Sequence, residues 1–217
     1  VGKMKTICWM GVLFVLTAGL SIAGIPVDDF ESYGLNTWPA AWLPGANVLD
    51  DPANNVVVQD PSDPANQVLK LHGLVDGCWS AHCCRPCDFG EEFVFEARLR
   101  NGSQTLSGCH PDRAGVAMRN GADWWNPHFY LLYFQGDGTL LGADQTALMP
   151  FQTDQWYDIR VQYTRYDKAV SLYYWVDGDF KARIYLTLED AWDHAQMDHL
   201  DIHTAEGTAY FDDVRVY

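Results

Sequence analysis

The fold is decided by Trp156-Tyr-Asp-Ile-Arg-Val-Gln-Tyr163 and the segment after it, Val170-Ser-Leu-Tyr-Tyr-Trp-Val-Asp-Gly178. Every second residue from Tyr157 onward in the first segment, and from Val170 onward in the second, is apolar, which is the period of a β-strand with one buried face. Asp177-Gly178 is a turn signal that ends the second segment. The two segments therefore predict neighbouring antiparallel strands.

The same alternation recurs along the chain, in segments separated by Gly, Asp, Asn or Pro. About twelve strands at this spacing predict an all-β fold, a two-sheet antiparallel β-sandwich of the jelly-roll type. The predicted strands are Val27–Tyr33, Asn55–Gln59, Gln67–His72, Glu92–Arg100, Ala114–Arg119, His128–Gln135, Thr139–Gly142, Gln155–Thr164, Ala169–Val176, Lys181–Leu188, His199–His203 and Ala209–Tyr217. The only helical pattern is the short segment Glu189–Gln196.

Residues 1–23 have the pattern of a secretory signal peptide, with a short extension before Met4. A basic start at Met4-Lys5 precedes the apolar run 7–20, and small residues follow at 21–24. A retained membrane anchor is the alternative, but about 20 apolar residues are needed to span a bilayer. We therefore predict one domain over 24–217 that is secreted, periplasmic or at the cell surface, with no membrane insertion after cleavage.

Composition limits the classes of partner. The 217 residues include 14 Lys and Arg against 29 Asp and Glu, a net charge of −15, and loss of Lys3 and Lys5 with the signal makes this −17. Such a charge repels phosphate, so we expect no nucleic-acid partner. Nine Trp, eleven Tyr and ten Phe are many for this length, and part of this aromatic excess is a candidate for ligand binding.

Five cysteines follow the predicted cleavage point, an odd number, and four of them lie within ten residues. In an exported protein this pattern favours a disulfide-bonded loop with two bridges and one leftover thiol. A zinc site built from cysteine thiolates with His82 or His110 is the alternative. The candidate cysteines are Cys78, Cys83, Cys84, Cys87 and Cys109.

Taken together, several segments resemble the concanavalin A-like lectin and glucanase superfamily, whose jelly roll is also called laminin-G-like. They are Asp28–Glu31, Gln67–Leu71, Trp156–Tyr163, Val170–Gly178 and Tyr210–Tyr217. The resemblance spans most of the predicted domain and implies fold better than function, because the superfamily contains binding modules, glycosidases and polysaccharide lyases.

The last strand carries a clue of its own. In a regular strand Val214 and Val216 would face one side of the sheet and Phe211 the other. Burying all three side chains therefore requires a bulge at Asp212-Asp213. The superfamily often holds a calcium ion near its first and last strands. The resemblance therefore implies Glu31 and Asp212 as side-chain ligands of a structural calcium ion, with no organic cofactor.

The outward faces of the predicted strands mix aromatic and charged residues, which suits stacking on sugar rings and hydrogen bonding to their hydroxyls. We therefore predict a noncatalytic domain that recognises a polysaccharide or glycan. The candidate ligand-binding residues are Trp124, Trp125, Trp156, Asp158, Arg160, Tyr173, Trp175 and Glu96.

A polysaccharide-active enzyme, either a lyase or a glycoside hydrolase, is the alternative, and an adhesion or structural domain at the cell surface is the third. The Glu-x-Asp-x-x-Glu signature of the superfamily's glucanases is absent from the sequence. A lyase would need Arg beside a uronate, with His and Tyr for proton transfer. The enzyme candidates are Arg98, Arg160, Tyr185, His199, Asp201 and His203. The last three share an exposed face of one strand, and an open groove over Arg98, Arg160, Tyr185 and His199 would support a sugar-binding face.

Overall fold

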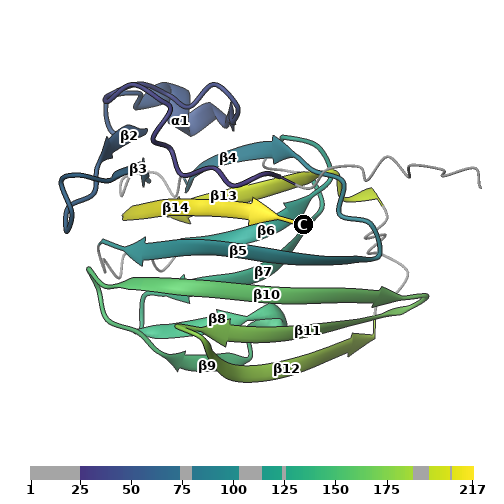
Figure 1. The fold of residues 1–217 in the computed structure, drawn as a ribbon. Coiled ribbons are helices and arrows are strands. Elements are labelled where there is room, and N and C mark those ends of the chain that lie inside the picture. Colours follow the sequence, from purple (N-terminus) through teal and green to yellow (C-terminus); the bar gives the residue numbers. More distant parts are fainter. Residues whose placement is uncertain (1–24, 74–79, 103–113, 124–125, 188–195, 206) are drawn as a thin grey trace, which may run out of the picture.

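Two antiparallel seven-stranded sheets pack face to face in the computed structural model, which describes residues 25–73, 80–102, 114–123, 126–187, 196–205 and 207–217 (Figure 1). The front sheet has the order β12 (Asp179–Thr187), β11 (Ala169–Val176), β10 (Trp156–Tyr166), β5 (Glu92–Asn101), β14 (Thr208–Val216), β3 (Gln67–His72) and β2 (Val56–Gln59). The predicted β-sandwich is confirmed.

The back sheet has the order β1 (Leu43–Pro44), β4 (Ser80–Pro86), β13 (His199–Ala205), β6 (Ala114–Arg119), β7 (His128–Gln135), β8 (Thr139–Gly142) and β9 (Ala147–Pro150). A short helix, α1 (Ala46–Asp50), and one 3₁₀ turn, η1 (Ala143–Gln145), complete the described elements. No described helix is long and apolar enough to cross a membrane.

The core lies between the sheets and follows the alternation in the sequence. On β10 the buried residues are Tyr157, Ile159, Val161 and Tyr163, as predicted. Tyr174 of β11 is buried to 1% and joins the layers, because its hydroxyl donates to the carbonyl of Leu131 and accepts from the N–H of Ala143, both at 2.9 Å. A polar group at this depth is tolerated because both of its hydrogen-bonding roles are used.

The predicted bulge in the last strand is present. The pairing of β14 with β5 changes register between Asp212 and Arg215, and Asp213 has a φ of +50°. Phe211 and Val214 are wholly buried and Val216 is 2% exposed. One extra residue thus brings side chains of both parities into the core, and it leaves Asp213 exposed.

The strand predicted at Val27–Tyr33 is wrong. Only one bridge forms there, between Asp28 and Val214, and Phe30 has a φ of +57°. The buried carboxylate of Asp28 accepts hydrogen bonds from the Phe30 N–H, the Trp42 indole and Arg85. The positive φ of Phe30 takes the backbone out of the extended conformation of a strand.

The loop predicted around the cysteines is also wrong over Ser80–Pro86, which is strand β4. Ala81 and Cys83 belong to the hydrophobic core, while His82 and Cys84 lie on the opposite face, so the segment does alternate. Cysteine packs here as a small hydrophobic residue, which the loop prediction did not allow for. Strands β1 and β9 and helix α1 were not predicted, and most of the predicted helix Glu189–Gln196 lies outside the described residues.

Candidate functional site

A groove of about 600 Å³ crosses the outer face of the front sheet. Strands β5, β10 and β11 supply its floor and walls, because their polar and aromatic residues alternate with the core residues. Five of the predicted binding or catalytic residues come together here. The lining residues are Val27, Glu96, Ala97, Arg98, Asp158, Ile159, Arg160, Trp175, Gly178, Asp213 and Arg215.

Glu96 is the centre of the groove's charge network. Its carboxylate accepts hydrogen bonds from Arg160 at 2.5 Å, from Arg215 Nε at 2.6 Å and from the Tyr217 hydroxyl at 3.1 Å. Partial burial opposes its ionisation, but the bonds from Arg215 and Arg160 hold the pKa of Glu96 below its usual value. Glu96 is therefore a fixed anion that orients two guanidinium groups.

Arg98 links the groove to a carboxylate behind it. Its guanidinium is 3.0 Å from Asp212 and 3.6 Å from Asp158, and it lies 4.9 Å from the ring centre of Trp156. Burial raises the pKa of Asp212 to about 6, although the hydrogen bond from Asn66 and the charge of Arg98 act in the opposite direction. Asp212 is 2% exposed and does not line the groove.

The aromatic candidates are placed differently from one another. Trp175 is half-buried in the groove wall, with the Arg160 guanidinium 5.7 Å from its ring centre. Tyr173 stacks on Trp175 beside the groove, while Trp156 is held by Arg98 and donates its indole N–H to Asp60 and Ser62. Trp124 and Trp125 lie outside the described residues.

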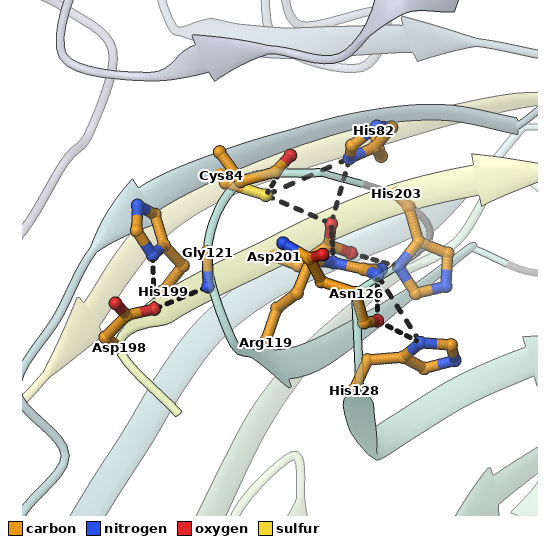
Figure 2. Close-up of polar contacts among 11 residues, drawn as sticks. His82, Cys84, Arg119, Gly121, Asn126, His128, Asp198, His199, Asp201 and His203 are labelled. Atoms are coloured by element: carbon orange, nitrogen blue, oxygen red, sulfur yellow. Dashed lines mark hydrogen bonds and ion pairs between the residues drawn. The ribbon is translucent and has the colours of Figure 1, made fainter. Parts of the chain in front are cut away.

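A second polar site lies on the outer side of the back sheet, around Asp201 of β13 (Figure 2). Oδ2 of Asp201 is 3.1 Å from His82 Nδ1, 3.3 Å from Cys84 Sγ and 3.2 Å from Arg119 Nε. Oδ1 is 2.8 Å from His203 Nδ1. We call these five residues the Asp201 cluster. Its members are at most 3% exposed.

The electrostatics of the Asp201 cluster follow from burial and from its one full ion pair. Burial opposes ionisation of Asp201, but hydrogen bonds from His203 and His82 and the charge of Arg119 hold its pKa well below the usual value. Burial lowers the pKa of His203, and burial together with Asp201 raises the pKa of the Cys84 thiol. At neutral pH the cluster thus contains an ionised Asp201 paired with Arg119, an uncharged His203 and a protonated Cys84.

The predicted exposure of Asp201 and His203 is therefore wrong, because β4 and β6 bring polar partners to Asp201 on both sides of β13, and Asp201 in turn bonds to His203. His199 shares their strand but bonds to Asp198 at 2.6 Å and does not join them (Figure 2). Sequence reasoning missed Arg119, and it assigned His82 and Cys84 to a separate cysteine site.

The six enzyme candidates do not share one groove. Arg98 and Arg160 line the groove on the front sheet, and Tyr185 is 61% exposed on its edge strand β12. His199, Asp201 and His203 belong to the back sheet, whose outer face is on the other side of the sandwich.

Cys83, Cys84 and Cys87 are buried, and none of them forms a disulfide with another described cysteine. Cys78, Cys109 and His110 lie outside the described residues, so the disulfide pairing stays a prediction. The calcium site also stays a prediction. In the structure the Glu31 carboxylate accepts hydrogen bonds from Gln67, and the Asp212 carboxylate accepts hydrogen bonds from Asn66 and Arg98.

Comparison with known proteins shows what this architecture resembles. No family model and no curated protein sequence matches the chain. Among solved structures, an endo-1,3-β-glucanase from Streptomyces sioyaensis superposes with a TM-score of 0.60 at 12% identity, covering 89% of this chain and 95% of the other. The cellulose-induced protein Cip1 gives 0.57 at 14% identity, covering 88% and 96%.

A sialidase also matches with a TM-score of 0.60 at 14% identity over 90% of this chain, which spans only 18% of the sialidase. At these identities the likeness concerns the fold alone, a sandwich of two antiparallel β-sheets.

Proposed function

We propose that this chain binds a carbohydrate polymer in the groove of the front sheet. The observation that carries the proposal is the half-buried Trp175 in a groove whose other side chains are mainly Arg, Asp and Glu. An indole ring gives a sugar ring a flat apolar surface, and planar charged groups hydrogen-bond its hydroxyls.

The arrangement favours recognition over hydrolysis. Glycoside hydrolysis requires two carboxyl groups that flank the scissile bond, one of them as a proton donor. Glu96 is tied to two arginines, and Asp158 has Arg98 beside it. These carboxylates are thus engaged in ion pairs before any ligand arrives.

Asp212 is the observation that favours the second candidate, a polysaccharide-active enzyme at the same groove. A carboxyl group with a pKa of about 6 has the property of a general acid, and Asp212 lies directly behind Arg98. Its 2% exposure means that Arg98 would have to move before Asp212 met a substrate.

The test is calorimetric titration of soluble polysaccharides into the protein and its Trp175→Ala variant. We expect at least one polysaccharide to bind, and Trp175→Ala to weaken that binding about tenfold, equivalent to about 1.4 kcal/mol. Tyr166→Ala is the matched control, because Tyr166 is 57% exposed and lies eight residues from Asp158 on β10, about 26 Å along the strand.

Two outcomes would overturn the proposal: no polysaccharide binds, or binding is equally strong in the Trp175→Ala variant. Incubation of each bound polysaccharide with the protein, followed by assays for reducing ends and for the ultraviolet absorbance of unsaturated uronates, distinguishes a binding domain from an enzyme.

A further inference from the structure

Three different metal-ligating atoms meet in the Asp201 cluster, far from the groove and independent of its function. They are His82 Nδ1 and Cys84 Sγ from β4 and Asp201 Oδ2 from β13. The two strands are paired in register, with Asp201 opposite Cys84. Neighbouring strands therefore hold these side chains in place without any contribution from a loop.

The spacing of the three atoms matches the coordination shell of zinc. Sγ to Nδ1 is 3.9 Å, Sγ to Oδ2 is 3.3 Å and Nδ1 to Oδ2 is 3.1 Å. Tetrahedral zinc, bonded to nitrogen and oxygen at about 2.0–2.1 Å and to sulfur at about 2.3 Å, separates its ligand atoms by about 3.3–3.6 Å. Shifts of a few tenths of an ångström would thus complete the site. We propose that His82, Cys84 and Asp201 bind a zinc ion.

The surroundings hold the ligands in the required orientation. His203 bonds to the other oxygen of Asp201 at 2.8 Å and fixes the carboxylate plane. Gly45 and Gly115 make room for the two imidazole rings, since a Cβ at these positions would lie 2.0 Å from His82 Nε2 and 2.9 Å from His203 Nε2. The Nδ1 atom of His82 therefore faces Asp201 while the ring packs against backbone.

Binding would exchange protons for the metal. Without metal, Cys84 donates its S–H to Asp201, and His82 donates from Nδ1 because a carboxylate only accepts. On binding, the S–H bond breaks, an S–Zn bond forms and the proton leaves to solvent. The ring proton of His82 moves to Nε2, and Nδ1 gives its electron pair to zinc.

Arg119 sets the charge balance of the site. Its Nε is 3.2 Å from Asp201 Oδ2, so Asp201 is already neutralised before a metal binds. With the Cys84 thiolate, the two negative ligands set against zinc and Arg119 leave a net charge of +1, which a hydroxide in the fourth position would neutralise. The competing description is a buried Arg119–Asp201 ion pair that holds no metal, and the experiment has to separate the two.

The experiment measures zinc bound to the reduced, tag-free full chain. The protein is stripped with a chelator and dialysed against Zn²⁺ or Co²⁺, and bound metal is counted by mass spectrometry. We expect about one ion per chain, loss of binding in Cys84→Ala, and a thiolate-to-metal charge-transfer band in the cobalt form. Cys83→Ala is the matched control, because the adjacent Cys83 thiol lies in the core and its loss should leave binding intact.

Substoichiometric binding, a cobalt band that persists in Cys84→Ala, or a disulfide at Cys84 in the unreduced protein would each overturn the proposal. Should Cys84→Ala fail to fold, zinc-edge anomalous scattering from crystals of the unmodified protein decides the matter. A peak between His82, Cys84 and Asp201 supports the site, and a peak elsewhere or none refutes it.

Discussion

Replacing Asp212 by Asn should change how the stability of the protein depends on pH. Asp212 is 2% exposed behind the groove, and its carboxyl has a pKa raised from 3.8 to about 6, chiefly by burial. An Asn side chain keeps the shape of Asp212 and has an oxygen that can accept hydrogen bonds from Asn66 and Arg98. It carries no charge, so its burial involves no desolvation of an ionised group. The substitution therefore isolates the cost of ionising this buried group.

The sign follows from proton binding. Between about pH 4 and pH 6 folded Asp212 keeps a proton that the unfolded chain has lost, so rising pH weakens the folded state. A pKa raised from 3.8 to about 6 corresponds to about 3 kcal/mol. The unfolding free energy of Asp212→Asn, minus that of the unmodified protein, should thus increase by about 3 kcal/mol between about pH 3.5 and pH 7.5.

Urea unfolding across this range, with EGTA present so that calcium contributes nothing, measures the difference. Asp167→Asn is the matched control, because it removes the same charge from an exposed residue just after the far end of β10 that does not shift the pKa of Asp212. A difference for Asp212→Asn that is constant with pH would show that folding does not raise the pKa of Asp212. A difference that decreases as pH rises would show that the ion pair with Arg98 outweighs burial.

Two further predictions concern the rest of the fold. Tyr174→Phe should destabilise the protein by about 1–3 kcal/mol, because it leaves the buried Leu131 carbonyl and Ala143 N–H without their partner, and a loss below about 0.5 kcal/mol in urea unfolding would contradict this. If Glu31 and Asp212 bind calcium, adding Ca²⁺ to EGTA-treated protein should raise its melting temperature, and Glu31→Gln should reduce the rise. Identical melts with Ca²⁺ and with EGTA would contradict the calcium site.

The front sheet was predictable because apolar and polar residues alternate along its strands. From Trp156 to Tyr163 each side chain that faces the core is apolar and its neighbours are polar or amphipathic, so periodicity alone places Asp158 and Arg160 on the outer face. Cross-strand pairing then brings Glu96 opposite Arg160 and Arg98 opposite Asp158. The residues that line the groove could thus be predicted from the alternation along each strand. The volume of the groove and its ion pairs could not.

The Asp201 cluster escaped prediction because burial there does not follow hydrophobicity. Asp201 and His203 carry polar side chains on the face that alternation assigns to solvent, and they are buried because each meets a polar partner. His203 bonds to Asp201 on its own strand, whereas His82 and Arg119, the partners of Asp201, come from β4 and β6, about 80 to 120 residues away in the chain. Periodicity within one segment contains no information about such pairing.

The cluster also bears on the odd number of cysteines. Adjacent residues of a strand point to opposite faces, so Cys83 enters the core while Cys84 meets Asp201. If Cys84 is a metal ligand, it is the leftover thiol, and the other four cysteines of the predicted mature chain are an even set. The groove and the cluster lie on opposite outer faces, so Trp175→Ala and Cys84→Ala act on separate sites. Each variant is therefore the other's control: Trp175→Ala should weaken carbohydrate binding and keep zinc, and Cys84→Ala should lose zinc and keep carbohydrate binding.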